Sequence, residues 1–261
     1  MLRQGTREVY PVRRSIVSTI KCELLVRHVG TDGGSMVGRI RRIDFGVNCY
    51  LIDVEGGYVL IDTSFPSKRD QLDAELAAAG CGPDDLRLIV LTHGDVDHAG
   101  NCAHLRSTLH APIAIHHQDA EMVRSGDMGA GRKSEPDRNT IAFRFLTWSS
   151  GLLNKITGTG AGFEVFEPDV LLEDGQDLSV YGLDARVVHL PGHSRGSIGI
   201  LTGDGDLFCG DLLVNVMRPA IHFYMDDLAR ADESIRKLNG LGVGTVYPGH
   251  GKPFPLGRLS T

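Results

Sequence analysis

Short apolar segments alternate with polar turns from Ile40 to the end of the chain. The segment IRRIDFGVNCYLIDV is followed by EGG and then by YVLIDTS, which predicts strands joined by a tight turn. Apolar residues recur at helical spacing in residues 67–80, which predicts a helix that ends at Gly80. The next segment, LRLIVL, is apolar almost without interruption and predicts a strand buried on both faces. This alternation is typical of an α/β protein.

The remaining regular segments continue the alternation. Residues 101–109 have the spacing of a helix, and APIAI predicts another strand. Strand-forming segments return from Phe166, a helix is predicted over 226–238, and the last strand lies in GTVYPGHG.

Two stretches are less regular. Residues 1–38 form an N-terminal lead-in of uncertain role, and residues 119–165 form a variable segment. The variable segment contains TIAFRFLTWSSGLLNKI, whose spacing predicts an amphipathic helix that either packs on the core or contacts the substrate through Trp148. Since neither a linker composition nor a repeat divides the chain, we expect residues 39–261 to form a single domain.

The charge balance and the cysteines limit the possible functions. The 261 residues include 27 Lys+Arg and 33 Asp+Glu, a net charge of −6, which removes the electrostatic basis for general nucleic-acid binding. No segment approaches the roughly 18 apolar residues of a membrane helix. The five cysteines form no CxxC pair, so we expect free thiols in a reducing cytoplasm. The expected partners are therefore a small-molecule substrate, no nucleic acid and no membrane, with a homodimer as an open option.

Histidine and aspartate residues gather where the predicted strands end. The segment THGDVDHAGN offers four potential metal ligands within six positions, and PGHSRGS, LFCGDLL and YPGHG each add one. Imidazole and carboxylate groups are the usual ligands of catalytic zinc and of non-haem iron or manganese. Such close packing of these groups would be costly without a cation to neutralise the carboxylates. The candidate ligands are His93, Asp95, Asp97, His98, His193, Asp211 and His250.

These motifs, in this order, resemble the metallo-β-lactamase superfamily. The resemblance extends from NCYLI and VLIDTS through HGDVDH, PGHSRGS and LFCGD to PGHG, which is most of the chain. It implies an αββα sandwich, in which two mixed β-sheets flanked by helices lie face to face and the metal site occupies one edge. Within the superfamily, the chain looks most like the glyoxalase-II-like and lactonase-like branch.

The resemblance also assigns roles to individual residues. It implies two divalent metal ions, with zinc favoured, each held by three ligands of its own. Asp211 would bridge the two ions, and Asp62, in LIDTS, would orient the ligand loop through hydrogen bonds. The ligands would be His93, Asp95 and His193 for the first ion and Asp97, His98 and His250 for the second.

One position departs from the family pattern HxHxDH. Asp95 stands where the pattern has its second histidine. A carboxylate is harder than an imidazole and carries a charge, which favours iron or manganese without excluding zinc. The flavodiiron branch also has a carboxylate there, but this chain lacks the flavodoxin-like region that supplies electrons in that branch.

The ligand set predicts a metal-dependent hydrolase. Two divalent ions can hold a bridging hydroxide near neutral pH, which would attack a small ester, thioester or lactone. Asp97 and Asp211 are the expected catalytic carboxylates, and His222 and Tyr224 are expected to contact the substrate. The alternative is a non-haem di-iron or mononuclear-iron redox enzyme, an oxygen reductase or a sulfur dioxygenase, which Asp95 favours. A non-catalytic metal-binding protein and a nuclease are further alternatives.

Overall fold

The computed structural model describes residues 24–25, 39–140 and 164–259. Its larger β-sheet has seven strands, in the spatial order β1 (Leu24–Leu25), β2 (Ile40–Asp44), β3 (Asn48–Val54), β4 (Gly57–Ile61), β5 (Leu86–Val90), β6 (Ile113–His116) and β8 (Val170–Leu172). Strands β1 to β4 pair antiparallel, whereas β4, β5, β6 and β8 pair parallel, so the sheet is mixed.

The smaller sheet has six strands. Five follow the order β15 (Phe254–Pro255), β14 (Thr245–Gly251), β11 (Asp206–Asn215), β10 (Ile198–Thr202) and β9 (Ala185–His189), and β12 (Ala220–Ile221) also pairs with β11. The β11–β14 pair is parallel and the other pairs are antiparallel, so this sheet is mixed as well. A short separate ladder joins β7 (Arg138–Asn139) to β13 (Tyr224–Met225).

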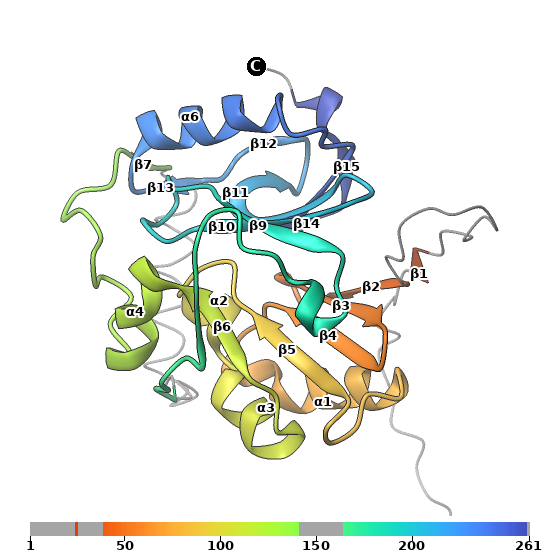
Figure 1. The fold of residues 1–261 in the computed structure, drawn as a ribbon. Coiled ribbons are helices and arrows are strands. Elements are labelled where there is room, and N and C mark those ends of the chain that lie inside the picture. Colours follow the sequence, from red (N-terminus) through yellow and green to blue (C-terminus); the bar gives the residue numbers. More distant parts are fainter. Residues whose placement is uncertain (1–23, 26–38, 141–163, 260–261) are drawn as a thin grey trace, which may run out of the picture.

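Helices cover the outer face of each sheet (Figure 1). Helices α1 (Arg69–Ala78) and α3 (Cys102–Leu109) lie against the larger sheet, and α6 (Leu228–Leu238) lies against the smaller one. Helices α2 (Val96–Ala99) and α4 (Ala120–Ser125) are short and lie in connections that follow β5 and β6. Single 3₁₀ turns occupy η1 (Pro66–Lys68), η2 (His117–Asp119), η3 (Ser179–Tyr181) and η4 (Leu256–Arg258).

Three apolar clusters separate these layers. Because successive strand residues point to opposite faces, Tyr50 and Ile52 of β3 pack between the sheets, whereas Leu51 packs toward α1. Leu72 and Leu76 are the buried residues of α1, and they complete the cluster beneath the larger sheet. A third cluster lies between the smaller sheet and α6. The predicted αββα sandwich of two mixed sheets flanked by helices is confirmed.

The two sheets are also joined by hydrogen bonds at one edge. Nδ2 of Asn48 donates to the backbone oxygens of Pro248 and Gly251 at 2.8 and 2.7 Å, and the hydroxyl of Tyr50 donates to Pro248 at 2.7 Å. These bonds connect β3 of the larger sheet to β14 of the smaller one. They fix the strand that carries His250 relative to the opposite sheet.

Several expectations fall outside the described residues. All of the predicted helix with Trp148 except its first residue, Thr140, lies outside the described residues, and so does nearly all of the lead-in, residues 1–38. Of the lead-in, the structure describes only β1, which pairs with β2. The four cysteines within the described ranges are buried free thiols, as expected. None of the helices in the described ranges has both the length and the hydrophobicity needed to span a bilayer.

Candidate metal centre

Both sheets deliver candidate ligands to one edge of the sandwich. Strand β5 ends at Val90 and leads into the loop and short helix α2 that carry the HGDVDH motif. In the smaller sheet, one ligand follows β9 and two lie within β11 and β14, which run parallel. The β11–β14 ladder is irregular on both sides of Gly210, and such an irregularity re-aims the side chains beside it. Asp211 is the residue that follows.

The structure brings six of the seven candidate ligands into two neighbouring triplets. The first contains His93, Asp95 and His193, with Nε2 of His193 2.9 Å and Nε2 of His93 3.5 Å from Oδ2 of Asp95. In each triplet, the ligand atoms lie within 4.8 Å of one another. The second triplet contains Asp97, His98 and His250. These are the groupings that the resemblance implies.

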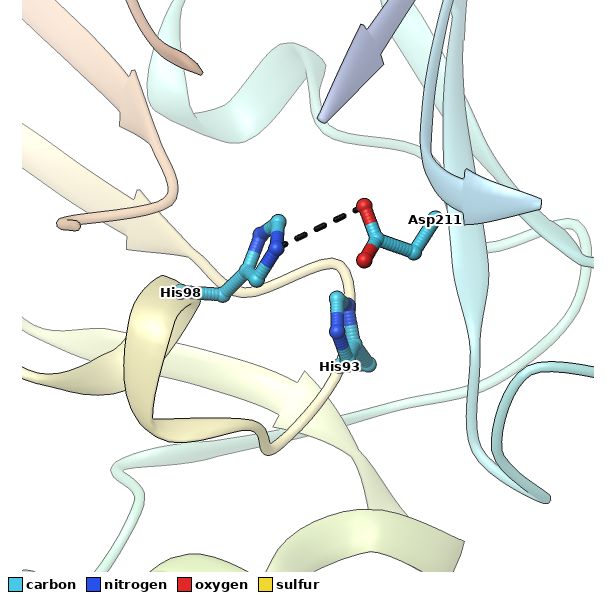
Figure 2. A group of neighbouring side chains, drawn as sticks. All are labelled: His93, His98 and Asp211. Carbon is cyan, nitrogen blue, oxygen red and sulfur yellow. Dashed lines mark ion pairs between the residues drawn. The ribbon is translucent and has the colours of Figure 1, made fainter. Parts of the chain in front are cut away.

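Asp211 lies between the two triplets. Its Oδ1 is 3.5 Å from Nε2 of His98, and its Oδ2 is 3.3 Å from Nε2 of His250 and 3.9 Å from Nε2 of His193. Figure 2 shows the carboxylate of Asp211 facing the rings of His98 and His93. Asp211 is therefore close to histidines of both triplets.

Three of the facing atoms are buried and have no hydrogen-bond partner. They are Nε2 of His93, Nε2 of His98 and Oδ1 of Asp211. Buried polar atoms are nearly always paired, so a group of unpaired ones indicates a missing partner. Since all three atoms can donate a lone pair and the ligand atoms of these residues lie within 4.8 Å of one another, a divalent cation fits the residues present.

Hydrogen bonds orient the histidine rings. Nδ1 of His250 donates to the backbone oxygen of Gly46 at 2.9 Å, and Nδ1 of His193 donates to that of Tyr224 at 3.1 Å. Each bond engages Nδ1 and directs Nε2 toward the carboxylates of the centre, where Nε2 can bind a cation that replaces its proton. This arrangement of outer hydrogen bonds is characteristic of histidines that bind metals.

Asp62 supplies the corresponding bond for His98. Its Oδ2 accepts from Nδ1 of His98 and from Oγ1 of Thr92, and its Oδ1 accepts from the backbone nitrogen of Thr92, each at 2.8 Å. Asp62 follows β4, and Thr92 precedes the ligand loop. These are the contacts that the predicted orienting role requires, although the role itself stays a prediction.

The protein's own charges show how strongly the centre requires neutralisation. Burial alone would raise the pKa of Asp211, but His250, His222 and His98 hold it well below its usual range. Conversely, burial alone would lower the pKa of His250, but the Asp211 carboxylate raises it to about 10. Without a cation, protonated histidines have to balance the carboxylates. A divalent ion would replace those protons.

His222 belongs to the same cluster. Its Nε2 is 3.3 Å from Oδ2 of Asp211, and its donor atoms form a further group with those of Asp211 and His193. Burial lowers the pKa of His222 to about 4, so the ring is neutral near pH 7 and has a lone pair to offer. No motif indicated this position in the cluster, because His222 lies in RPAIHFYMDD, away from the other ligands in the chain.

The other predicted substrate residues differ in their surroundings. Tyr224 packs its ring against His193, with the centroids 5.6 Å apart, and its backbone oxygen orients His193. Tyr224 therefore contacts the candidate ligand His193 directly. Trp148 lies outside the described residues, so its predicted role is untested.

Asp119 joins the two ligand loops, and sequence reasoning missed it. Its Oδ2 accepts from Oγ of Ser194 at 2.6 Å and from the backbone nitrogen of Gly94 at 3.3 Å, and its Oδ1 accepts from that of Gly196 at 2.7 Å. Gly94 flanks His93, and Ser194 flanks His193. One buried carboxylate therefore fixes the separation of two candidate ligands from different sheets.

Comparison with known families gives an independent result. Residues 42–250 match the family described as the metallo-beta-lactamase superfamily. The matched range includes the whole candidate centre.

Curated relatives include named hydrolases. The chain is 27% identical over 229 residues to the "Probable metallo-hydrolase YflN" of Bacillus subtilis, covering 79% of this chain and 81% of that protein. It is 28% identical over 192 residues to the bovine "Acyl-coenzyme A thioesterase MBLAC2", covering 69% of this chain and 61% of the relative. It is 26% identical over 232 residues to an "Atrochrysone carboxyl ACP thioesterase" of Aspergillus fumigatus, and the match covers 87% of this chain and 56% of that protein. The chain thus spans only about six-tenths of the length of the two thioesterases.

Solved structures support the same fold. The chain superposes on the metallo-beta-lactamase family protein TTHA1429 of Thermus thermophilus with a TM-score of 0.59 and 25% identity, covering 81% of this chain and 71% of the other. It superposes on TTHA1623, solved in a di-iron-bound form, with a TM-score of 0.58 and 26% identity. The match covers 83% of this chain and 94% of TTHA1623.

Proposed function

The chain belongs to the metallo-beta-lactamase superfamily of metal-dependent hydrolases, and we propose that its own reaction is the hydrolysis of a thioester. The observation that carries the proposal is the convergence of three unpartnered buried donor atoms, on His93, His98 and Asp211. The substrate class is supported by two relatives that are named thioesterases. Esters and lactones have the same electrophilic carbonyl and form the nearest alternatives.

Each part of the centre has a chemical task in this proposal. His93, Asp95 and His193 would hold one divalent ion, Asp97, His98 and His250 a second, and Asp211 would contact both. When bound, such ions lower the pKa of water and polarise the scissile carbonyl.

A carboxylate of the chain would carry out the proton transfer to the leaving group. The side chain of Asp97 is 21% exposed, whereas that of Asp211 is 3% exposed. Asp97 is thus better placed to carry a proton between the centre and a leaving thiolate. His98 and His250 hold its pKa below the usual range against the effect of burial, so it is ionised and can accept the proton.

A substrate panel tests the proposal. Purified protein is stripped of metal, reloaded separately with zinc, manganese and iron, and assayed with acyl thioesters, lactones, phosphodiesters and β-lactams. We expect thioesters to give the highest kcat/KM and Asp211→Ala to remove that activity. His110→Gln, a change on an exposed residue paired with Asp84 away from the centre, is the matched control and should keep full activity. Equal or higher turnover on another class would replace thioesters as the substrate.

A redox enzyme is the second candidate, and a specific observation favours it. Asp95 adds a carboxylate to the first triplet, and a relative of 26% identity is known in a di-iron-bound form. Iron-loaded protein that consumes oxygen and shows no hydrolysis on the panel would support this candidate over the hydrolase.

We also make proposals about the substrate size, the partners, the location and the domain organisation of the protein. We propose a small-molecule substrate, no nucleic-acid or membrane partner, a cytoplasmic location and a single domain over residues 39–261. A homodimer is the assembly to test, by light scattering on the purified chain.

A further inference from the structure

Arg132 lies against Asp95, the residue that departs from the family pattern. Its Nη2 is 2.7 Å from Oδ1 of Asp95. The two side chains are only 9% and 18% exposed, so the opposite charges face each other largely out of water. Charge-assisted bonds of this length are among the stronger polar contacts in proteins. The variable segment thus contributes a positively charged side chain to the candidate metal centre.

The guanidinium of Arg132 is held from a second side. Its central carbon lies 5.1 Å from the centroid of the Tyr224 ring, a cation–π contact. The next residue, Lys133, donates its backbone nitrogen to Oδ1 of Asp226 at 2.8 Å, which anchors the loop. Arg132 is therefore part of a fixed structure around Asp95 and is not a loose surface side chain.

The two oxygens of Asp95 have different surroundings. Oδ1 faces Arg132, whereas Oδ2 lies 2.9 Å from Nε2 of His193 and 3.5 Å from Nε2 of His93. A free carboxylate would offer a cation two oxygens and a full negative charge. Here one oxygen is engaged and the charge is balanced. In both respects, Asp95 resembles the single neutral nitrogen of the histidine that the family pattern has at this position.

We propose that Arg132 determines the metal specificity of the first triplet. By binding Oδ1 of Asp95, it keeps Asp95 a one-oxygen, charge-balanced ligand, so the triplet selects zinc over harder cations such as manganese. Asp95 alone would favour the harder cations, and the Asp95–Arg132 pair reverses that preference. The inference rests on the proposed function only in requiring that the centre bind a divalent cation.

A double-mutant cycle of Arg132→Met and Asp95→His tests the proposal. Zinc and manganese affinities of each metal-free protein are measured by competition with a chromophoric chelator. We expect Arg132→Met to raise the ratio of manganese to zinc affinity by about tenfold or more, because Asp95 regains its second oxygen and its full charge. In the Asp95→His background, the same substitution should leave the ratio unchanged. The proposal is overturned if Arg132→Met leaves the ratio of manganese to zinc affinity unchanged in the wild-type background, or if it changes the ratio equally in both backgrounds.

A stability measurement covers the possibility that a variant folds poorly. In metal-free protein, each single substitution removes the opposite charge that faces the remaining, largely buried charge of the pair, so each should lower Tm. The double variant should have a higher Tm than either single variant, because neither charge is stranded. If the decrease in Tm of the double variant equals the sum of the decreases of the two single variants, the pairing of Arg132 with Asp95 is refuted. Arg124→Met is the matched control: it breaks an ion pair with Glu167 that is more exposed, and it should change neither Tm nor the metal ratio appreciably.

The outcomes separate this inference from the proposed function. Protein that shows the predicted metal ratios but hydrolyses nothing on the panel refutes the function and leaves the role of Arg132 supported. Protein that binds neither zinc nor manganese refutes both.

Discussion

Nδ1 of His98 lies 2.8 Å from Oδ2 of Asp62, and both side chains are almost fully buried. The same carboxylate accepts two hydrogen bonds from Thr92. Asp62 therefore connects the end of β4, the start of the ligand loop and the ring of His98. Because Nδ1 of the ring is held by Asp62, its Nε2 faces the centre and can bind a cation that replaces its proton.

Asp62→Asn should weaken metal binding without unfolding the protein. The amide keeps the shape of the side chain but loses the charge that fixes the His98 ring. Changes of this kind cost about 10–100-fold in metal affinity or activity. Chelator competition measures the effect, and Asp53→Asn on β3 is the control. Equal affinities for the two variants would contradict the orienting role of Asp62.

Asp211→Ala should remove activity with every substrate. Asp211 lies between the two triplets, and its loss leaves His98, His222 and His250 without the carboxylate that all three face. We expect kcat/KM to fall by at least about a hundredfold and metal content to drop, both measured on the same preparation. Asp204→Ala, on an exposed turn, should behave as wild type. Near-normal turnover by the Asp211 variant would show that this carboxylate does not organise the centre.

Gly249→Ala should disrupt the centre through sterics alone. A Cβ at this position would overlap Oδ1 of Asp211 and come within 2.8 Å of Cε1 of His98. Forced overpacking of this kind costs about 1–3 kcal/mol, and the displaced carboxylate should also lower metal content. Metal analysis and thermal unfolding measure the two effects. Gly257→Ala, where a Cβ would meet open space, is the control, and equal behaviour of both variants would contradict the expected clash.

The metal-free protein should lose stability as pH rises above neutrality. The pKa of His250 is raised to about 10 in the folded chain, whereas an unfolded histidine titrates near 6.5. Between these values, the folded state holds a proton that the unfolded state has lost. Stability from His250 is therefore complete below about pH 6.5 and disappears as pH approaches 10, at a rate of at most about 1.4 kcal/mol per pH unit.

Urea unfolding of metal-free protein across this pH range measures the slope. His250→Gln should flatten the curve, and so should loading with zinc, because a bound cation takes over from the proton. A free energy of unfolding that is constant or increases over this range would contradict the assignment of the proton.

Local patterns predicted most of the fold. The helix expected over 226–238 is α6, Leu228–Leu238, where Asp227 accepts a capping hydrogen bond from Arg230 at 3.0 Å. The strand expected in LRLIVL is β5, and its four apolar residues are buried, whereas Arg87 is exposed. Such signals involve neighbouring residues, so they can be recognised without knowing the fold.

The candidate ligands were recognisable for the same reason, because each lies in a short motif at a strand end. The roles of His222, Asp119 and Arg132 in the centre were not, because they depend on contacts with distant residues. Arg132 reaches Asp95 across 37 positions, and Asp119 reaches Ser194 across 75. No periodicity or spacing in one sequence encodes such contacts.

Each half of the described chain supplies part of the ligand set, and neither part is sufficient. His93 to His98 come from the larger sheet, whereas His193, Asp211 and His250 come with the smaller sheet. During translation, the growing polypeptide carries an incomplete set until β14 has been made and paired with β11. The complete ligand set therefore exists only after the two sheets have docked, so metal loading of the proposed centre would be a late step in maturation.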